Sequence, residues 1–79
     1  MPYYEREMIK MEELRNLQTR VHEIGQLIDT LSETIRERMN KYDMESMIEV
    51  TELACEIKKL KSEMNNNYTR IKKLYKILK

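Results

Sequence analysis

The 79-residue chain has no tryptophan or phenylalanine and one residue each of glycine, proline, cysteine and histidine. A β protein needs turn residues at short intervals, so the scarcity of glycine and proline excludes a sheet-based fold. The single cysteine, Cys55, cannot form an internal disulfide, and an unpaired thiol is typical of a reducing, cytoplasmic compartment. His22 is far from Cys55 in the sequence, so we expect no metal site.

Several functional classes lack their required residues. No segment approaches the roughly 18 consecutive apolar residues of a membrane-spanning helix, and the first six residues lack the apolar core of a signal peptide. One glycine cannot build a phosphate-binding loop, and no convergent set of polar residues points to catalysis. We therefore expect a cytoplasmic protein that is not an enzyme, has no cofactor and has no membrane span. The frequent Lys, Asn, Ile and Met residues are typical of a low-GC bacterium or its phage.

Apolar residues recur at alternating steps of three and four, which is the a/d heptad pattern of a helical coiled coil. The chain is 37% charged and 41% hydrophobic, a composition that suits long amphipathic helices. We call these residues the seam. Its first half comprises Leu14, Leu17, Val21, Ile24, Ile28, Leu31 and Ile35. Its second half comprises Val50, Leu53, Ile57, Leu60, Met64, Asn67, Ile71, Leu74 and Leu78.

The two halves of the seam are out of phase, because Val50 follows Ile35 by one residue more than two heptads. Either a skip residue in a continuous helix or a chain reversal would absorb the slip, and we favour the reversal. Asn40 can adopt the left-handed conformation that ends a helix. Asp43 or Ser46 can cap the next helix, and the segment from Ser46 to Glu49 matches a capping box.

The sequence thus predicts one all-α domain over residues 1–79, an antiparallel helical hairpin. We expect helices over about residues 4–40 and 46–78, joined by a turn over about 41–45. In this register Val21 lies near Met64 and Leu14 lies near Ile71. Asn65, Asn66 and Asn67 leave two interpretations open, because Asn67 can fix the register as a buried polar residue, or the three asparagines can break the helix at 65–67.

Further apolar residues flank the seam and make it too wide for one pair of helices. They are Leu27, Ala54, Tyr68, Tyr75 and Ile77. Gly25 and Ser32 provide low points where a neighbouring helix could approach. Such faces are typical of four-helix bundles, so we expect two hairpins to form a homodimer or a higher oligomer.

The two ends of the chain differ in charge. Residues 1–57 carry 7 basic and 13 acidic side chains (net −6), whereas residues 58–79 carry 8 basic side chains and one acidic side chain (net +7). The basic tail can pair with the acidic N-terminal region of the hairpin, or it can contact phosphate groups of a nucleic acid. Candidate contacts to a phosphate or an acidic partner are Arg70, Lys72, Lys73, Lys76 and Lys79.

The expected turn is rich in adaptable apolar side chains. They are Met39, Tyr42, Met44, Met47 and Ile48. Methionine is flexible and suits surfaces that bind a protein partner. These five residues, which we call the tip, are either a partner-binding surface or a plug for the end of the core.

Residues 28–64 resemble the short helical-hairpin phosphatases that act on sporulation response regulators. The similarity lies in Ile28-x-x-Leu31, a polar turn, and the segment Val50-x-x-Leu53-Ala54-Cys55-Glu56-Ile57-Lys58-Lys59-Leu60. The family signature Ser-Gln-Glu-Leu-Asp aligns with Ala54–Lys58, so Lys58 replaces the acidic residue needed for phosphatase activity. The resemblance implies a hairpin that contacts a response regulator.

The first expectation for function is a small interaction or regulatory protein: an adaptor, an inhibitor or a chaperone-like protein. It would act through self-association and binding to an unidentified protein partner. The alternatives are a nucleic-acid-binding accessory protein and a hairpin similar to the response-regulator phosphatases.

Overall fold

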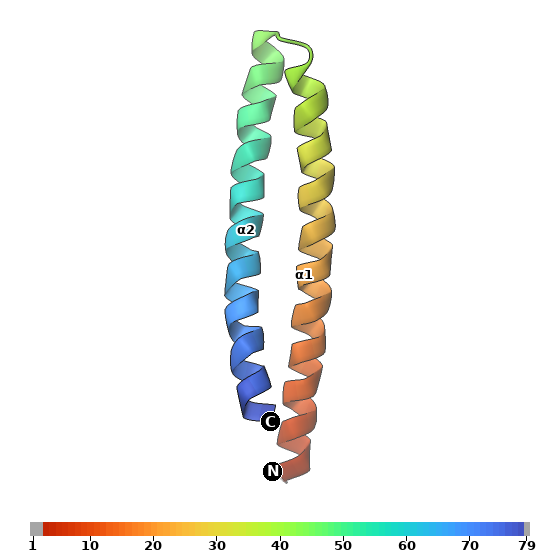
Figure 1. The fold of residues 1–79 in the computed structure, drawn as a ribbon, viewed down its shortest axis with the longest axis vertical. Coiled ribbons are helices and arrows are strands. Elements are labelled where there is room, and N and C mark those ends of the chain that lie inside the picture. The colour runs from red at the N-terminus through yellow and green to blue at the C-terminus, as the bar shows by residue number, and fades with distance from the viewer. Residues whose placement is uncertain (1–2, 79) are drawn as a thin grey trace.

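A computed structural model describes the backbone of residues 3–78 and the side chains of residues 6–78. These residues form helix α1 (Tyr3–Met39) and helix α2 (Met44–Leu78), which lie antiparallel (Figure 1). The molecule measures 61 × 18 × 14 Å. The predicted all-α helical hairpin is therefore confirmed.

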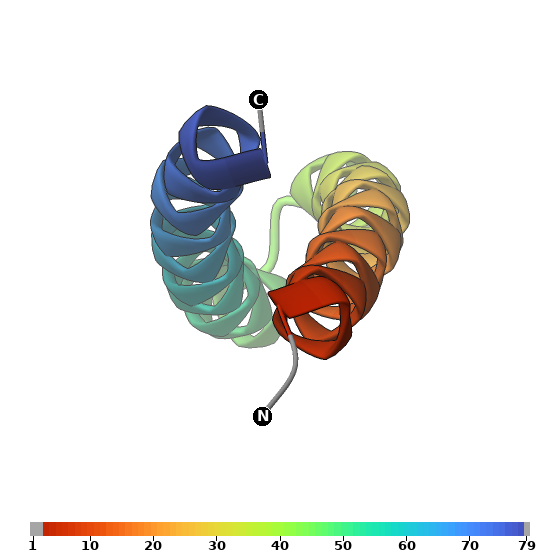
Figure 2. The same cartoon turned by 90° about the horizontal axis from the view of Figure 1, so that it is seen from below.

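The two helices curve around each other along their length, as the view along the long axis shows (Figure 2). A repeat of seven residues spans slightly less than two turns of a straight α-helix, so a seam with this repeat stays at the interface only if the helices coil. The heptad spacing thus accounts for both the helices and their shared curvature.

The chain reverses at residues 40–43. The amide of Asn40 donates to the carbonyl of Arg36 at 3.3 Å, and the amide of Lys41 donates to the carbonyl of Arg38 at 3.1 Å. Within the described chain, the non-glycine residue with positive φ is Tyr42, at 56°. The left-handed residue is therefore Tyr42, not Asn40, because the last turn of α1 extends through the Asn40 amide before the chain turns.

Helix α2 begins at an aspartate cap. The Ser46 amide donates to Oδ1 of Asp43 at 2.6 Å, and the Met47 amide donates to the Asp43 carbonyl at 3.1 Å. Asp43 is thus the N-cap, and Ser46 is the third helical residue, with 5% of its surface exposed. The helix therefore starts at Met44, two residues earlier than expected. Both Asp43 and Ser46 are residues that commonly cap helices, and the turn uses the first of them, Asp43.

Helix α2 continues through the three asparagines, and the break considered at residues 65–67 does not occur. Asn67 is partly buried at its seam position. Met64 and Ile71 on either side of it also pack toward α1. Packing against the partner helix outweighs the weak helix propensity of asparagine here.

The sixteen seam residues are all buried or partly buried between the two helices. Ile24 and Leu74 have no exposed surface, and Leu60 and Ile71 are each 8% exposed. Complete burial of such a side chain stabilises a fold by roughly 1.5–3 kcal/mol. The remaining seam residues keep part of their surface in solvent, as expected for two helices without further cover.

The hairpin exposes a large surface for its size. Its accessible surface is 6516 Å², whereas a compact monomer of 9.7 kDa would expose ~5,100 Å². The difference is therefore about 1,400 Å² by that scaling. Two helices alone cannot enclose a core as a globular domain of equal mass does.

Candidate interaction site

Charged side chains bridge the helices along one side of the seam, which we call the paired edge. Arg20 donates to Glu63 through Nε at 2.6 Å and Nη2 at 3.1 Å. Arg70 donates to Glu13 through Nε at 2.7 Å and Nη2 at 3.2 Å. All four residues occupy heptad g positions, each directly before a seam residue. The seam residues that follow them were expected to meet as Val21 with Met64 and Leu14 with Ile71, so the ion pairs have the expected register.

A further ion pair lies on this edge near the turn. Arg38 Nε lies 2.9 Å from Glu49 Oε2, at an angle outside hydrogen-bond geometry, and this nitrogen is enclosed. Leu27 and Ile77 also occupy g positions and are 44% and 51% exposed. The paired edge is thus mainly polar, with isolated apolar residues.

The ion pairs change the proton affinities of their carboxylates. Hydrogen bonds from Arg70 hold the pKa of Glu13 below its usual value, and those from Arg20 lower the pKa of Glu63. The same contacts raise the pKa values of Arg20 and Arg70. Hydrogen bonds from Ser46 likewise lower the pKa of Asp43 at the cap. The acidic and basic ends of the chain therefore meet within the hairpin, at Glu13 and Arg70.

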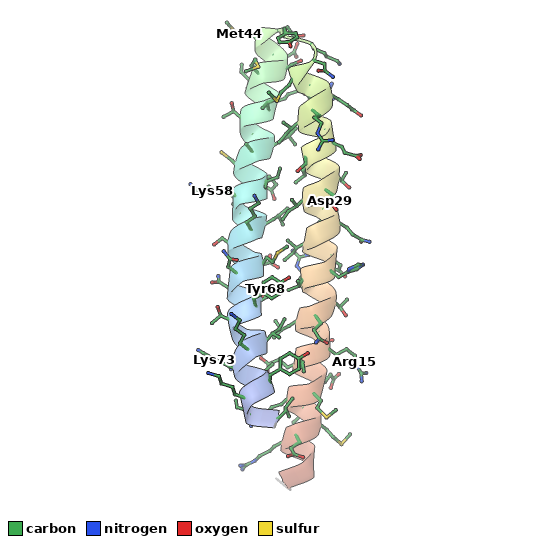
Figure 3. The ribbon with its side chains drawn as sticks, in the orientation of Figure 1. Arg15, Asp29, Met44, Lys58, Tyr68 and Lys73 are labelled. Atoms are coloured by element: carbon green, nitrogen blue, oxygen red, sulfur yellow. The ribbon has the colours of Figure 1, made fainter. Side chains whose placement is uncertain are left out.

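The opposite side of the seam, which we call the open edge, is almost uncharged. It consists of the heptad e positions Met11, Gln18, Gly25, Ser32 and Met39 of α1 and Met47, Ala54, Lys61, Tyr68 and Tyr75 of α2. Lys61 is the one charged residue of the ten. Tyr68 and Tyr75 are 46% and 48% exposed, and Figure 3 shows Tyr68 beside the gap between the helices. This edge presents aromatic and small residues without ionic partners.

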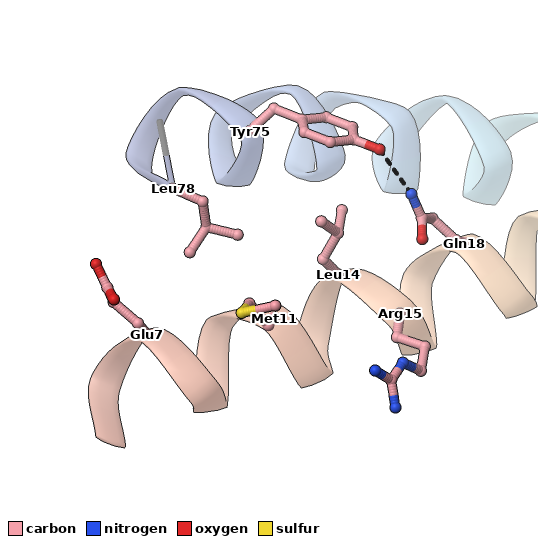
Figure 4. Close-up of a pocket in the computed structure, with 7 residues that line it drawn as sticks. All are labelled: Glu7, Met11, Leu14, Arg15, Gln18, Tyr75 and Leu78. Carbon is pink, nitrogen blue, oxygen red and sulfur yellow. Dashed lines mark hydrogen bonds between the residues drawn. The ribbon is translucent and has the colours of Figure 1, made fainter. Parts of the chain in front are cut away.

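Two hollows indent the open edge. One, of about 380 Å³, lies near the open end of the hairpin between Met11, Leu14, Tyr75 and Leu78. Figure 4 shows Leu78 and Leu14 projecting into it from opposite helices, with Gln18 Nε2 donating to Tyr75 Oη at 2.8 Å. The second, of about 400 Å³, includes Gln18, Gly25 and Tyr68. The hollows share Gln18, so they form one indented strip.

Gly25 lies within this strip on α1. A Cβ atom at this position would have no tertiary neighbour within 4 Å, so the hairpin itself does not need glycine there. Glycine in the middle of a helix is destabilising by roughly 0.5–1 kcal/mol relative to alanine. Gly25 therefore leaves an indentation in the surface of α1, and this indentation does not contribute to packing within the hairpin.

The five tip residues are all exposed. Tyr42 and Met44 are 87% and 82% exposed, and Met39, Met47 and Ile48 are each about half exposed. Ser46 is the buried residue at this end. The tip residues therefore do not plug the core, and they remain candidates for partner binding.

The basic candidates divide into two groups. Arg70 is held by Glu13, whereas Lys72, Lys73 and Lys76 are exposed on α2. Lys79 lies outside the described residues. Among the side chains of residues 6–78, pairing with the acidic N-terminal region therefore involves Arg70, and none of these three lysines forms an ion pair.

His22 and Cys55 lie on the exposed surface, as their heptad positions indicate. Within the described residues, no group of three or more His, Cys, Asp or Glu side chains is placed to hold a metal ion. Neither helix in this part of the chain has a stretch long and apolar enough to cross a membrane.

Sequence reasoning identified Gly25, Ser32, Tyr68 and Tyr75 but did not assign them to one edge. It missed Met11 and Gln18, and also the g-position ion pairs. The sequence did contain a signal for these ion pairs. Residues 13 and 70 have opposite charges, as do residues 20 and 63, and the two residues of each pair face each other in the antiparallel register.

Comparisons with protein-family models, with curated proteins and with solved structures find no match to this chain. The resemblance to the hairpin phosphatases therefore rests on the residues quoted above.

Proposed function

We propose that this chain is a non-enzymatic interaction protein, and that two copies associate through their open edges into a four-helix bundle. The open edge carries the proposal, because it combines exposed tyrosines, an indented strip and a helix glycine that the hairpin does not need. A neighbouring helix can fill the strip and pack against Tyr68 and Tyr75.

The size of the uncovered surface supports a second copy as the occupant. A stable interface buries about 800 Å² on each partner, and the hairpin exposes about 1,400 Å² more than a compact monomer of its mass. Small domains without disulfides or metals commonly gain their stability by oligomerisation. Two open edges related by a two-fold axis would cover each other and complete one core.

Charge also favours this edge over the paired edge. Burying the open edge desolvates one lysine per chain, Lys61, whereas burying the paired edge would desolvate Arg20, Glu63, Glu13 and Arg70. Removing ionised groups from water is costly even when they are paired. The paired edge therefore remains in solvent, and the tip residues that lie outside the open edge, Tyr42, Met44 and Ile48, remain free at the end of the bundle for a protein partner.

A substitution at Gly25 tests the association without damage to the hairpin. Gly25→Arg should raise helix propensity by about 1 kcal/mol and fill the strip. Sedimentation equilibrium at micromolar concentration should give a dimer for the wild type and a monomer of 9.7 kDa for the variant, which stays helical by circular dichroism. Thr30→Arg, on the exposed outer side of α1, should remain dimeric.

The tip provides the second arm of this experiment. Met44→Glu combined with Ile48→Glu should leave the dimer and its helicity unchanged but abolish capture of a partner from native lysate. A wild-type chain that sediments as a helical monomer would refute the association, as would a Gly25→Arg variant that dimerises as strongly as wild type. Loss of helicity in the tip variant would show that the tip is structural.

A further inference from the structure

We infer that the outer side of α2 binds the phosphate backbone of nucleic acid through a row of lysines, which we call the lysine stripe. The stripe consists of Lys58, Lys59, Lys72, Lys73 and Lys76, all exposed and at heptad positions that point away from α1. Lys58 and Lys73 can be located on α2 in Figure 3.

The stripe has a regular spacing on one continuous helix. Lys58 and Lys59 precede Lys72 and Lys73 by fourteen residues, which is about 21 Å along an α-helix. The whole stripe spans about 27 Å, and α2 continues unbroken beneath it. A nucleic-acid duplex presents about one negative charge per 1.7 Å of its axis, so a row of cations of this length can contact several phosphates at once.

The cations of the stripe form no ion pair with any acidic side chain among residues 6–78. The ion pairs among the described residues all use arginine. The acidic residue of this half of α2, Glu63, lies on the paired edge, where Arg20 holds it. The folded chain therefore carries unneutralised positive charge along one side of α2, although its net charge is only +1.

The residues between the lysines indicate the class of partner. Ser62, Asn65, Asn66 and Thr69 are exposed between the two lysine pairs, and they are polar and neutral. A membrane-binding helix needs apolar residues on its contact face, but the b, c and f positions from Lys58 to Lys76 hold only lysine, serine, asparagine and threonine. Protein interfaces rely on aromatic or apolar anchors, and the stripe has none. Lysines with neutral hydrogen-bonding residues between them fit phosphates of a nucleic-acid backbone, contacted without base recognition.

The stripe is separate from the surfaces assigned above. It occupies b, c and f positions, whereas the open edge uses e positions and the paired edge uses g positions. A monomer can therefore bind nucleic acid, and a dimer would carry two stripes. The inference does not depend on self-association.

Fluorescence anisotropy with a labelled random-sequence DNA duplex and the full chain tests the inference. With about five phosphate contacts, the logarithm of the association constant should fall with the logarithm of salt concentration with a slope of about −4.5. Between 50 and 200 mM salt the affinity should then fall roughly 500-fold. The same titration with single-stranded DNA of equal length distinguishes the form of nucleic acid, because its slope per contact is shallower.

The variant Lys72→Gln with Lys73→Gln removes two of the cations and should reduce the slope to about −2.7. The control, Arg36→Gln with Lys41→Gln, removes the same charge from exposed residues outside the stripe and should bind as wild type does. Helicity of both variants is checked by circular dichroism. Three results would overturn the inference: no binding at 50 mM salt, equal weakening of variant and control, or binding to anionic phospholipid vesicles but not to DNA.

Discussion

The two edges of the hairpin flank the same seam but have opposite chemistry. On the paired edge, Arg20 reaches Glu63 and Arg70 reaches Glu13, so the charged groups find their partners within one chain. On the open edge, Tyr68 and Tyr75 remain about half exposed, although Tyr75 bonds to Gln18. An ion pair can be satisfied between two helices in water, whereas an aromatic face can be covered only by further apolar surface.

The largest effect should come from the seam that supports both edges. Leu74 is fully buried, so Leu74→Ala should destabilise the fold by about 2–5 kcal/mol. Urea unfolding followed by circular dichroism measures this loss. Leu27→Ala, on the exposed part of the paired edge, should cost less than about 1 kcal/mol, in line with surface substitutions in general. Equal costs for the two variants would contradict the assigned core.

The open edge should dominate association. Tyr68→Ala combined with Tyr75→Ala removes two exposed aromatic residues and should weaken the dimer by about 2 kcal/mol or more, roughly 30-fold in Kd. Analytical ultracentrifugation over a concentration series measures this Kd. The matched pair on the other edge, Leu27→Ala with Ile77→Ala, should change the Kd by less than about threefold. A larger effect of the second pair would assign association to the paired edge.

The smallest effect should come from acid titration of the paired edge. Glu13 and Glu63 have lower pKa values in the folded chain than when unfolded. Their contribution to stability is therefore present above about pH 4.3, the unfolded value for glutamate, and is lost as the pH falls through the folded values. The melting temperature should fall with acidification, and less steeply in the variant Glu13→Gln with Glu63→Gln.

The control for this titration removes two glutamates that lie outside the ion pairs. Glu33→Gln with Glu37→Gln should keep the wild-type pH dependence, because both side chains are exposed and form no ion pair among the described residues. Identical pH curves for all three proteins would show that the ion pairs do not stabilise the hairpin.

The heptad pattern predicted the helices because helix formation depends mainly on residues that are close in the sequence. The steps from Leu14 to Ile35 and from Val50 to Leu78 predict two amphipathic helical segments. The one-residue slip between them allowed a skip residue or a reversal, and the capping residues near the slip favoured the reversal. The same local reasoning could not choose between Asp43 and Ser46 as the cap, since both are residues of the preferred type. It also overestimated the asparagines as a possible break, because the burial of Met64, Asn67 and Ile71 between the helices stabilises this part of α2.

By itself, the sequence determined two helices, a common seam and a reversal near residue 42, since heptad spacing and backbone propensities act within a few turns of one chain. The tertiary structure alone decided which flanking residues meet. In an antiparallel pair, g positions face g positions and e positions face e positions. That geometry brings Glu13 to Arg70 and Arg20 to Glu63 on one edge. It leaves the tyrosines and Gly25 together on the other edge, and this grouping cannot be read from either helix alone.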